Sequence, residues 1–599
     1  MHSTINNITN RIIKRSKATR ESYLDEVDGM FADGVYRSSL SCGNLAHSFA
    51  GCNTSDKDEL SGNSTKNIGL VTAYNDMLSA HRVYENYPEE LRGYARKHKA
   101  VLQVAGAVPA MCDGVTQGKE GMELSLFSRD VIALSTCIGL SHNVFDAVLS
   151  LGICDKIVPG LMMGCLNYGH LPVVFVPGGP MPTGISNDEK ARIRQEFAEG
   201  KIDRKELLKG ESDSYHSPGT CTFYGTANSN QMLMEMMGMQ LPGSSFVNPD
   251  TAHRRLLNDK AVEIAVENSK LGLERSISRI INEKSIVNAI IGLLATGGST
   301  NHTIHLIAIA KAAGIIIDWE DMSDLSDVVP LITRMYPNGA ADVNHFHAAG
   351  GMCFVIKTLL RQGLLHNDVT TILGHGLEQY TKESKILNGE ISFSEGADAS
   401  LNLNVIRPAS EPFSADGGIK ILKGNIGRSV IKTAAVAEEH RIIEAPALVF
   451  HEQQDLLDAF KKNELNKDFI AVVPFQGPKQ NGMPELHNLT PSLSILQKRG
   501  YKIGLITDGR MSGASGKVPA AIHLTPEAMD GGLISKIRNG DLLKLDAIKG
   551  VIDVLDYETV SMRAPSTLEA KNRNSLGRGL FANARQNVST SEEGASFIL

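Results

Sequence analysis

Two kinds of metal-binding side chain, thiols and carboxylates, lie in short segments of this sequence. Cys154-Asp155-Lys156 directly follows the apolar stretch 147–153, so we expect these three side chains at the end of a strand. Strand ends are where α/β folds place their ligands. Asp113 and Glu485 stand in two further segments, and carboxylate oxygens are ligands that Mg²⁺ prefers. An isolated acid at either position is also typical of a turn or of a helix start.

The 8 cysteines are scattered along the chain, and none lies beyond Cys353. In a large cytoplasmic enzyme such cysteines are usually buried thiols or metal ligands rather than disulfides. A cysteine-ligated centre must therefore belong to the N-terminal part of the chain. Cys221 is one candidate, because it lies in a loop rich in glycine and threonine before a Met-rich helix expected at residues 232–239. A buried, inert thiol is the competing interpretation for any single cysteine.

A glycine-rich turn surrounds Ser512. Residues 503–507 predict a strand and Asp508-Gly509 a turn, and the glycines allow the backbone to approach a ligand closely. A Walker phosphate loop is excluded, because Met511 and Val518 occupy positions that require Gly and Ser or Thr. A nucleophile elbow is excluded as well, since glycines do not flank Ser512 at the required spacing. A strand-to-helix turn with solvated serines is the alternative interpretation.

Length and composition predict that these segments belong to a large globular enzyme. At 599 residues the chain is too long for one ordinary core, so we expect two large domains. Apolar residues at 42% and charged residues at 21% exclude a chain that is disordered over most of its length. The net charge of -7, without an arginine-rich run, excludes a nucleic-acid binder and favours a small polar substrate.

The sequence predicts neither membrane insertion nor secretion. No apolar run approaches the roughly 18 residues that cross a bilayer. The stretch 286–295 comes nearest and is interrupted by Asn288 and Gly292. Residues 1–25 carry basic side chains but no apolar segment of a secretory signal. We therefore expect a cytoplasmic protein without membrane contact.

The predicted fold is α/β, with two domains. The first, residues 1–395, is an α/β/α domain with a mostly parallel sheet. Short apolar runs at residues 68–72, 100–104, 130–140 and 171–176 alternate with segments of helical periodicity, so we expect these runs to be parallel strands joined by helices. A capping-box pattern at Ser186–Glu189 opens a charged outer helix.

The second predicted domain, residues 396–599, is smaller, β-rich and barrel-like, and it carries the Glu485 and Ser512 loops. We place the boundary near residue 395, because residues 385–418 are polar and lack periodicity. Short strands are expected at residues 419–422, 447–450, 469–473 and 542–555.

Long segments of this sequence resemble the dihydroxy-acid dehydratase and 6-phosphogluconate dehydratase family. The resemblance covers about residues 65 to 590. Segments shared with the wider family are Cys154-Asp155-Lys156, Thr296–Asn301, Gly482–Glu485 and Thr507–Gly513. Longer segments match the 6-phosphogluconate dehydratase branch, namely Tyr74–His81, Val108–Gly118, Gly219–Asn228 and Asn344–Gly350.

The resemblance implies an iron-sulfur cluster on Cys154 and Cys221, with [4Fe-4S] favoured over [2Fe-2S]. The sequence departs from the family at Ala80, where members with a third cluster cysteine carry that residue. Either Cys112 or a non-thiolate group then completes the ligand set.

The resemblance also implies a divalent ion, Mg²⁺ or Mn²⁺, beside the cluster. Its ligands are Asp113, Asp155, Glu485 and Lys156, with the lysine as a carbamate. An ammonium repels a cation, whereas a carbamate presents anionic oxygens to it.

The implied activity is that of a hydro-lyase, which converts 6-phospho-D-gluconate to 2-dehydro-3-deoxy-6-phospho-D-gluconate and water in the Entner-Doudoroff pathway. This chemistry requires loss of a weakly acidic C2 proton and departure of hydroxide from C3, which two positive centres assist. Ser512 is implied as the base, with Ser515 as the second candidate, and Lys156 is the other implied catalytic residue.

The expected partner is a phosphorylated sugar acid, and we expect a homodimer or a higher homo-oligomer. The loops with Arg428, Lys479 and Lys517 are candidate sources of cationic donors for the phosphate. Two alternatives stay open: a dehydratase of another sugar acid or of branched-chain dihydroxy acids, and a non-catalytic iron-sulfur electron carrier or sensor.

Overall fold

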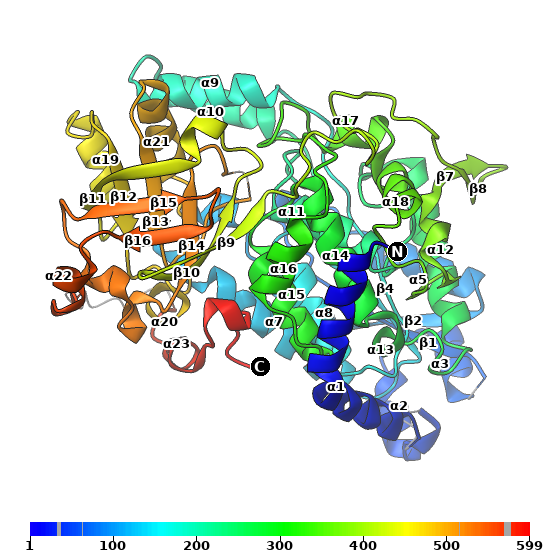
Figure 1. The fold of residues 1–599 in the computed structure, drawn as a ribbon. Coiled ribbons are helices and arrows are strands. Elements are labelled where there is room, and N and C mark those ends of the chain that lie inside the picture. The colour runs from blue at the N-terminus through cyan, green and yellow to red at the C-terminus, as the bar shows by residue number, and fades with distance from the viewer. Residues whose placement is uncertain (33–36, 63, 514, 568–576) are drawn as a thin grey trace.

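Parallel strands form the sheet of the first half of the chain. The computed structural model describes residues 1–32, 37–62, 64–513, 515–567 and 577–599. The sheet has the order β2-β1-β3-β4, and all neighbouring strands are parallel. Its strands are β1 (Lys66–Thr72), β2 (Ala100–Ala107), β3 (Ala147–Leu151) and β4 (Val173–Phe175). β3 and β4 are buried throughout, as expected for a parallel sheet that helices cover (Figure 1).

One predicted strand is wrong. Residues 130–140 belong to the helix α7 (Ser125–Leu140), whereas strands lie at the other three predicted positions. The buried residues of α7 include Arg129, Ile132 and Thr136, which recur at the period of a helix. Polar side chains such as Arg129 are buried together with the apolar ones, so the helix has no clear polar face and its periodicity is weak in the sequence.

Helices α7 and α8 (Ile157–Leu166) pack very closely. A Cβ atom added at Gly160 of α8 would lie 2.5 Å from the Arg129 carbonyl oxygen and 2.8 Å from Ile132 Cβ. Only glycine lets the two backbones approach to this distance. Because α8 begins directly after Lys156, this contact fixes the start of the helix next to the Cys154-Asp155-Lys156 segment.

An outer helical hairpin links the two halves of the chain. It consists of α9 (Asn187–Ala198) and α10 (Arg204–Ser214), and it lies beside α21 (Leu489–Lys498) of the second half (Figure 1). Ser186 is the N-cap of α9 and accepts a hydrogen bond from the Glu189 backbone N–H, which confirms the predicted helix start. The Lys498 ammonium donates to Gln195 at 3.3 Å.

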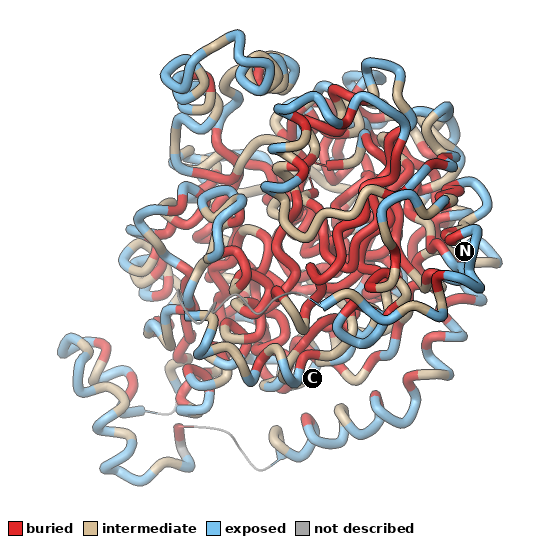
Figure 2. Tube along the Cα trace, turned by 90° about the vertical axis from the view of Figure 1, so that its left-hand side faces the viewer, coloured by how far each residue is buried: buried red, intermediate tan, exposed pale blue. Residues whose placement is uncertain are grey.

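The centre of the molecule is helical. The helices α11 (Thr226–Met236), α14 (Glu283–Thr296) and α15 (His302–Ala312) are buried along most of their lengths. In contrast, α2 (Cys42–Phe49) and α3 (Thr54–Ser61) project from the body (Figure 2). None of the helices in the described ranges is both long and apolar enough to cross a membrane. The other helices of the first half are α1 (Ser3–Ala32), α4 (Ser79–Arg82), α5 (Tyr87–Lys97), α6 (Asp113–Thr116), α12 (Ala252–Asn268), α13 (Ile277–Ile280), α16 (Trp319–Ser326), α17 (Val343–Ala348) and α18 (Gly351–Arg361).

The second half forms a closed barrel with the strand order β10-β14-β13-β12-β11-β15-β16-β9. Neighbours from β11 to β14 are parallel, and apolar side chains such as Leu422, Val472 and Leu545 fill the interior. The α/β class with a parallel sheet and a barrel-like second part is confirmed. The strands are β9 (Ile419–Gly424), β10 (Gly427–Lys432), β11 (Ile442–Val449), β12 (Phe469–Val473), β13 (Ile503–Thr507), β14 (Ala520–Thr525), β15 (Leu542–Asp546) and β16 (Val551–Val554).

The C-terminal tail leaves the barrel and packs on the first half. Arg129, which is fully buried, donates hydrogen bonds to the carbonyls of Gly594 and Ala595 at 2.9 and 2.8 Å. The domain boundary near residue 395 stays a prediction. The remaining elements are β5 (Thr370–Thr371), β6 (Gly374–His375), β7 (Lys382–Leu387), β8 (Glu390–Glu395), α19 (Gln453–Lys461), α20 (Pro478–Asn481), α22 (Tyr557–Ser561) and α23 (Ala582–Asn587).

The close contact of α7 and α8 predicts opposite effects for two glycine-to-alanine substitutions. Gly160→Ala forces the helices apart and should lower the free energy of unfolding by about 1–3 kcal/mol. Gly93→Ala is the matched control, because Gly93 is exposed on α5 with no heavy atom within 4 Å of an added Cβ. It should raise that free energy by about 0.5–1 kcal/mol. Urea unfolding measures both, and an unchanged Gly160→Ala midpoint would contradict the packing argument.

Candidate active site

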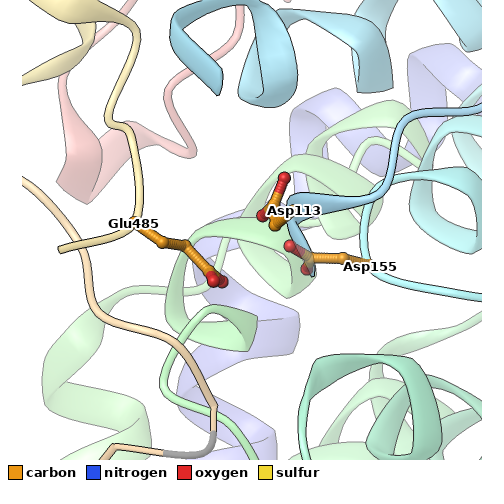
Figure 3. Close-up of side chains that lie close together, drawn as sticks. All are labelled: Asp113, Asp155 and Glu485. Carbon is orange, nitrogen blue, oxygen red and sulfur yellow. The ribbon is translucent and has the colours of Figure 1, made fainter. Parts of the chain in front are cut away.

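Three carboxylates meet between the sheet and the barrel. Asp113 begins α6 beyond the end of β2, Asp155 follows β3, and Glu485 lies in the barrel loop between α20 and α21. One oxygen from each lies within 4.8 Å of the others, and the side chains point toward one another (Figure 3). All three residues are buried, with exposures of 8%, 6% and 5%. Such a group of hard oxygen donors suits a divalent cation.

Two buried cations compensate these carboxylates. The Lys156 ammonium lies 2.5 Å from an oxygen of Asp113 and 2.5 Å from one of Asp155. The Arg510 guanidinium lies 2.7 Å from Asp113, 2.8 Å from Glu485 and 3.3 Å from Asp155. Sequence reasoning singled out Lys156 but missed Arg510, whose only signal was its place in the family segment Thr507–Gly513.

The pKa values of the carboxylates are shifted in opposite directions. Burial would raise the pKa of Asp155, but Lys156, His305 and Arg510 outweigh burial and hold that pKa well below its usual range. For Glu485, burial and the nearby Asp113 carboxylate dominate, and they raise its pKa to about 7. Glu485 therefore accepts a proton more readily than Asp155, and a divalent cation would displace that proton.

Three thiols lie next to the carboxylates. A hydrogen bond between Cys112 and Cys154 lowers the pKa of Cys112 to about 7 and raises that of Cys154 well above its usual value. Burial raises the pKa of Cys221 to about 11, and the Cys112 thiolate contributes to this rise. The three cysteines singled out in the sequence thus lie close enough to interact electrostatically.

A strained turn positions Cys154. Its φ of 78° lies in the left-handed region that glycine favours. The Asn230 side chain, from α11, donates to the carbonyls of Cys154 and Asp155 at 2.9 Å each and stabilises this turn. Ala80 is buried in α4, and the neighbouring Ser79 carbonyl accepts from the Gly219 N–H at 2.9 Å, so an apolar methyl group lies near the Cys221 loop.

Ser512 lies in a loop that packs against the start of α11. A Cβ atom at Gly513 would lie 2.9 Å from Gly225 Cα and from the Thr226 nitrogen. The glycine in this loop therefore lets the backbone approach the start of α11 closely. Ser515 Oγ is within 3.0 Å of His487 Nδ1 and 3.2 Å of Thr490 Oγ1, so Ser515 is engaged at the start of α21.

Backbone pairing places the Ser512 loop beside Glu485. Residues Glu485 and Arg510 form a parallel bridge, and the Leu486 N–H donates to the Arg510 carbonyl at 3.0 Å. Gln117, from the first half, donates to the Glu485 carbonyl at 3.1 Å. The site is thus assembled from both halves of the chain.

Two of the three cations considered for phosphate binding have acidic partners. Arg428 lies 2.6 Å from a carboxylate oxygen of Glu320 and 2.6 Å from one of Glu592. Lys479 lies 2.6 Å from Asp530. Lys517 is exposed, with its ammonium 5.6 Å from the centre of the Tyr336 ring.

The chain matches both models of one enzyme family. The N-terminal model of dihydroxy-acid/6-phosphogluconate dehydratases covers residues 66–380 and the C-terminal model residues 404–595. The chain belongs to this family. Phosphogluconate dehydratases of Rhizobium meliloti (strain 1021) and Escherichia coli (strain K12) are 56% and 55% identical to it, over 100% of this chain and 99% and 100% of theirs. A dihydroxy-acid dehydratase of Caldanaerobacter subterraneus subsp. tengcongensis is 33% identical over 88% of this chain and 93% of its own.

Another segment that this dehydratase shares with its family, Thr296–Asn301, lies beside the Ser512 loop. Ser299 Oγ is 2.8 Å from Thr226 Oγ1, at the start of α11. The buried Lys432, from barrel strand β10, donates to the carbonyls of Gly297 and Gly298 at 2.8 and 3.1 Å. The barrel therefore also positions a segment of the first half.

The buried charges predict that Arg510→Met strongly destabilises the metal-free protein. Removing the guanidinium leaves three buried carboxylates with one ammonium, and breaking a buried ion pair typically costs about 3–5 kcal/mol. Arg361→Met is the control, because Arg361 and Asp398 form an exposed pair at 2.9 Å and its loss should cost at most about 1 kcal/mol. Urea unfolding in the presence of a chelator compares the two variants. Equal, small losses would contradict the assigned role of Arg510.

Proposed function

We propose that this dehydratase is a hydro-lyase that converts 6-phospho-D-gluconate to 2-dehydro-3-deoxy-6-phospho-D-gluconate and water, the dehydration step of the Entner-Doudoroff pathway. The observation that carries the substrate assignment is the identity of 56% and 55%, over the full length, to phosphogluconate dehydratases. The identity to a dihydroxy-acid dehydratase is 33%. A branched-chain dihydroxy acid is therefore the less favoured substrate.

We assign an iron-sulfur cluster, of the [4Fe-4S] type, to Cys112, Cys154 and Cys221. Two observations support the fit. Cys112 and Cys154 already share a hydrogen bond, and Cys221 interacts electrostatically with Cys112. Soft thiolates are the ligands that iron-sulfur clusters require. Cys112 takes the third position, since Ala80 offers no ligand atom.

We assign Mg²⁺ or Mn²⁺ to Asp113, Asp155, Glu485 and Lys156. The three carboxylates fit a hard cation in donor type and in spacing. Lys156 fits only after a chemical change, because its ammonium occupies the position between Asp113 and Asp155. Carbamylation replaces this ammonium with anionic oxygens and releases the two carboxylates for the cation.

When bound, the cluster and the ion supply Lewis acidity toward the carboxylate and hydroxyl groups of the substrate. Ser512 accepts the C2 proton at Oγ. A serine is a weak base unless a nearby positive charge lowers its pKa, and the Glu485–Arg510 backbone bridge places the Ser512 loop beside the proposed metal ligand Glu485. The C2 proton and the C3 hydroxide together make the released water, and the enol that remains tautomerises to the 2-keto acid.

A homodimer and a cytoplasmic location complete the proposal. The dimer has an apolar surface available, because Val104 on edge strand β2 is 38% exposed and Leu134 and Ile138 on α7 are 44% and 67% exposed. A carrier or sensor without catalysis is disfavoured, since it leaves the buried carboxylates beside the thiols without a role.

Anaerobic purification followed by iron, sulfide and Mg²⁺ analysis, with activity measured in parallel, tests the function. We expect 6-phospho-D-gluconate to be converted to a 2-keto acid and a branched-chain 2,3-dihydroxy acid to react far more slowly. Preference for the branched-chain acid would overturn the substrate assignment. A cluster that changes oxidation state without any water elimination would favour the carrier or sensor.

Cys112→Ser, Cys154→Ser and Cys221→Ser should each lose the cluster and the activity together. A hard serine oxygen replaces a soft thiolate in each variant, so iron is held too weakly. Cys42→Ser is the control, because Cys42 is exposed on α2. Iron and sulfide content is the measurement. A Cys112→Ser variant with full iron content would assign the third position to a non-thiolate group or to another cysteine.

Ser512→Ala should retain the cluster but lose dehydration and C2 proton exchange. Removing a general base typically costs about 10²- to 10⁴-fold in rate. Solvent-deuterium exchange at C2 isolates proton abstraction from hydroxide departure. Ser515→Ala serves as the control, since Ser515 is engaged with His487 and Thr490. If Ser512→Ala exchanges the C2 proton at the normal rate, Ser512 is not the base.

A further inference from the structure

The substrate that we propose carries its phosphate at the opposite end of the carbon chain from the reacting C2 and C3. A dianionic phosphate in a protein is bound by cations and hydrogen-bond donors. The binding site for it must therefore lie near the reacting centre but outside the group of carboxylates, which would repel it.

Lys190 on α9 is a buried cation near this centre. The residue is 9% exposed, and no carboxylate forms an ion pair with it within the described part of the chain. Its ammonium lies 3.6 Å from the centre of the Tyr215 ring and 6.0 Å from the centre of the Phe223 ring. Two aromatic faces compensate a buried charge only in part, so an anionic ligand is the partner that this ammonium lacks.

The position of Lys190 relative to the thiols follows from its neighbours. Phe223 is two residues from Cys221, and Asn228 holds this loop by donating to the carbonyls of Cys221 and Phe223 at 2.6 and 2.8 Å. Burial lowers the pKa of Lys190 to about 8, and the nearby Cys221 thiol opposes that shift. The ammonium thus lies on the side of the Cys221 loop that faces α9.

Arg194 lies one helical turn along the same face of α9, and Glu211 compensates its charge. Its guanidinium pairs with Glu211 at 2.5 and 2.9 Å, which fixes its orientation. Arg194 lowers the pKa values of Lys190 and His487 and Glu211 opposes both shifts, so these groups lie within electrostatic range of one another. His487 in turn contacts Ser515 at 3.0 Å, in the segment that follows Ser512.

We infer that Lys190, which unlike Arg194 forms no ion pair in the described part of the chain, binds the terminal phosphate of the sugar acid, so that α9 determines the preference for a phosphorylated substrate. The inference rests on the proposed function, because it concerns the phosphate of that substrate. The sequence candidates serve this role less well. Arg428 and Lys479 are paired with acids, and the exposed Lys517 lines a cavity of about 460 Å³, together with Lys498 and Asp188, to which none of the cysteines or carboxylates of the site contributes.

Lys190→Met tests the inference, because methionine keeps much of the length and the contact with Tyr215 but removes the charge. We expect KM for 6-phospho-D-gluconate to rise about 10- to 100-fold, the effect of losing one charge-assisted hydrogen bond. Competitive inhibition by D-gluconate, which lacks the phosphate, should change less than threefold. Lys190→Arg should restore most of the affinity.

Arg192→Met is the matched control on the same helix, since Arg192 is exposed and pairs with Glu189 and Glu196. Its KM should match the wild type, and so should that of Lys517→Met. Iron content and circular dichroism verify that each variant folds. If Lys190→Met raises KM no more than Arg192→Met does, or if Lys517→Met shows the larger effect, the inference is overturned.

Inorganic phosphate provides a test that needs no turnover. It should bind the wild-type holoenzyme and bind the Lys190→Met holoenzyme at least about tenfold more weakly, as measured by isothermal titration calorimetry. Equal affinity of the two proteins for phosphate would contradict the inference even if the enzyme is active. Wild-type enzyme that does not dehydrate 6-phospho-D-gluconate would overturn the proposed function instead, so the two failures are distinguishable.

Discussion

A cluster of five buried charges joins the two halves of this protein. Asp113, Asp155 and Lys156 come from the ends of sheet strands, and Glu485 and Arg510 come from barrel loops. An isolated buried charge is strongly unfavourable, so neither half can bury its part of the cluster without the other. The charges therefore fix how the barrel lies on the sheet, and in doing so they create a compact set of oxygen donors.

The first half supports this cluster with a rigid backbone. Glycines bring α8 against α7, and Asn230 holds the carbonyls of the turn in which Cys154 has a left-handed conformation. Packing in a protein interior tolerates little displacement, so the thiol and the adjacent carboxylate keep their positions. The same half receives the C-terminal tail through Arg129, which further couples the end of the chain to α7.

Charge is separated across the site in a way that suits a substrate with two different ends. Carboxylates gather where a divalent ion and the reacting carbons would lie, while the buried Lys190 lies on α9, beyond the Cys221 loop. Because α9 also packs against α21 of the barrel, both halves border the two ends of the site. A phosphorylated acid would be oriented by this polarity before any contact with Ser512 is made.

The sequence by itself determined the α/β class, the barrel and the family, because strand periodicity and family segments such as Thr507–Gly513 are local patterns. It failed for residues 130–140, where buried polar residues obscured the helical period of α7. The family resemblance grouped Asp113, Asp155 and Glu485 around one ion, which the residues by themselves do not indicate. Only the tertiary structure decided that Arg510 binds all three carboxylates. Such contacts join residues far apart in the chain, and their energies depend on burial, which no local pattern encodes.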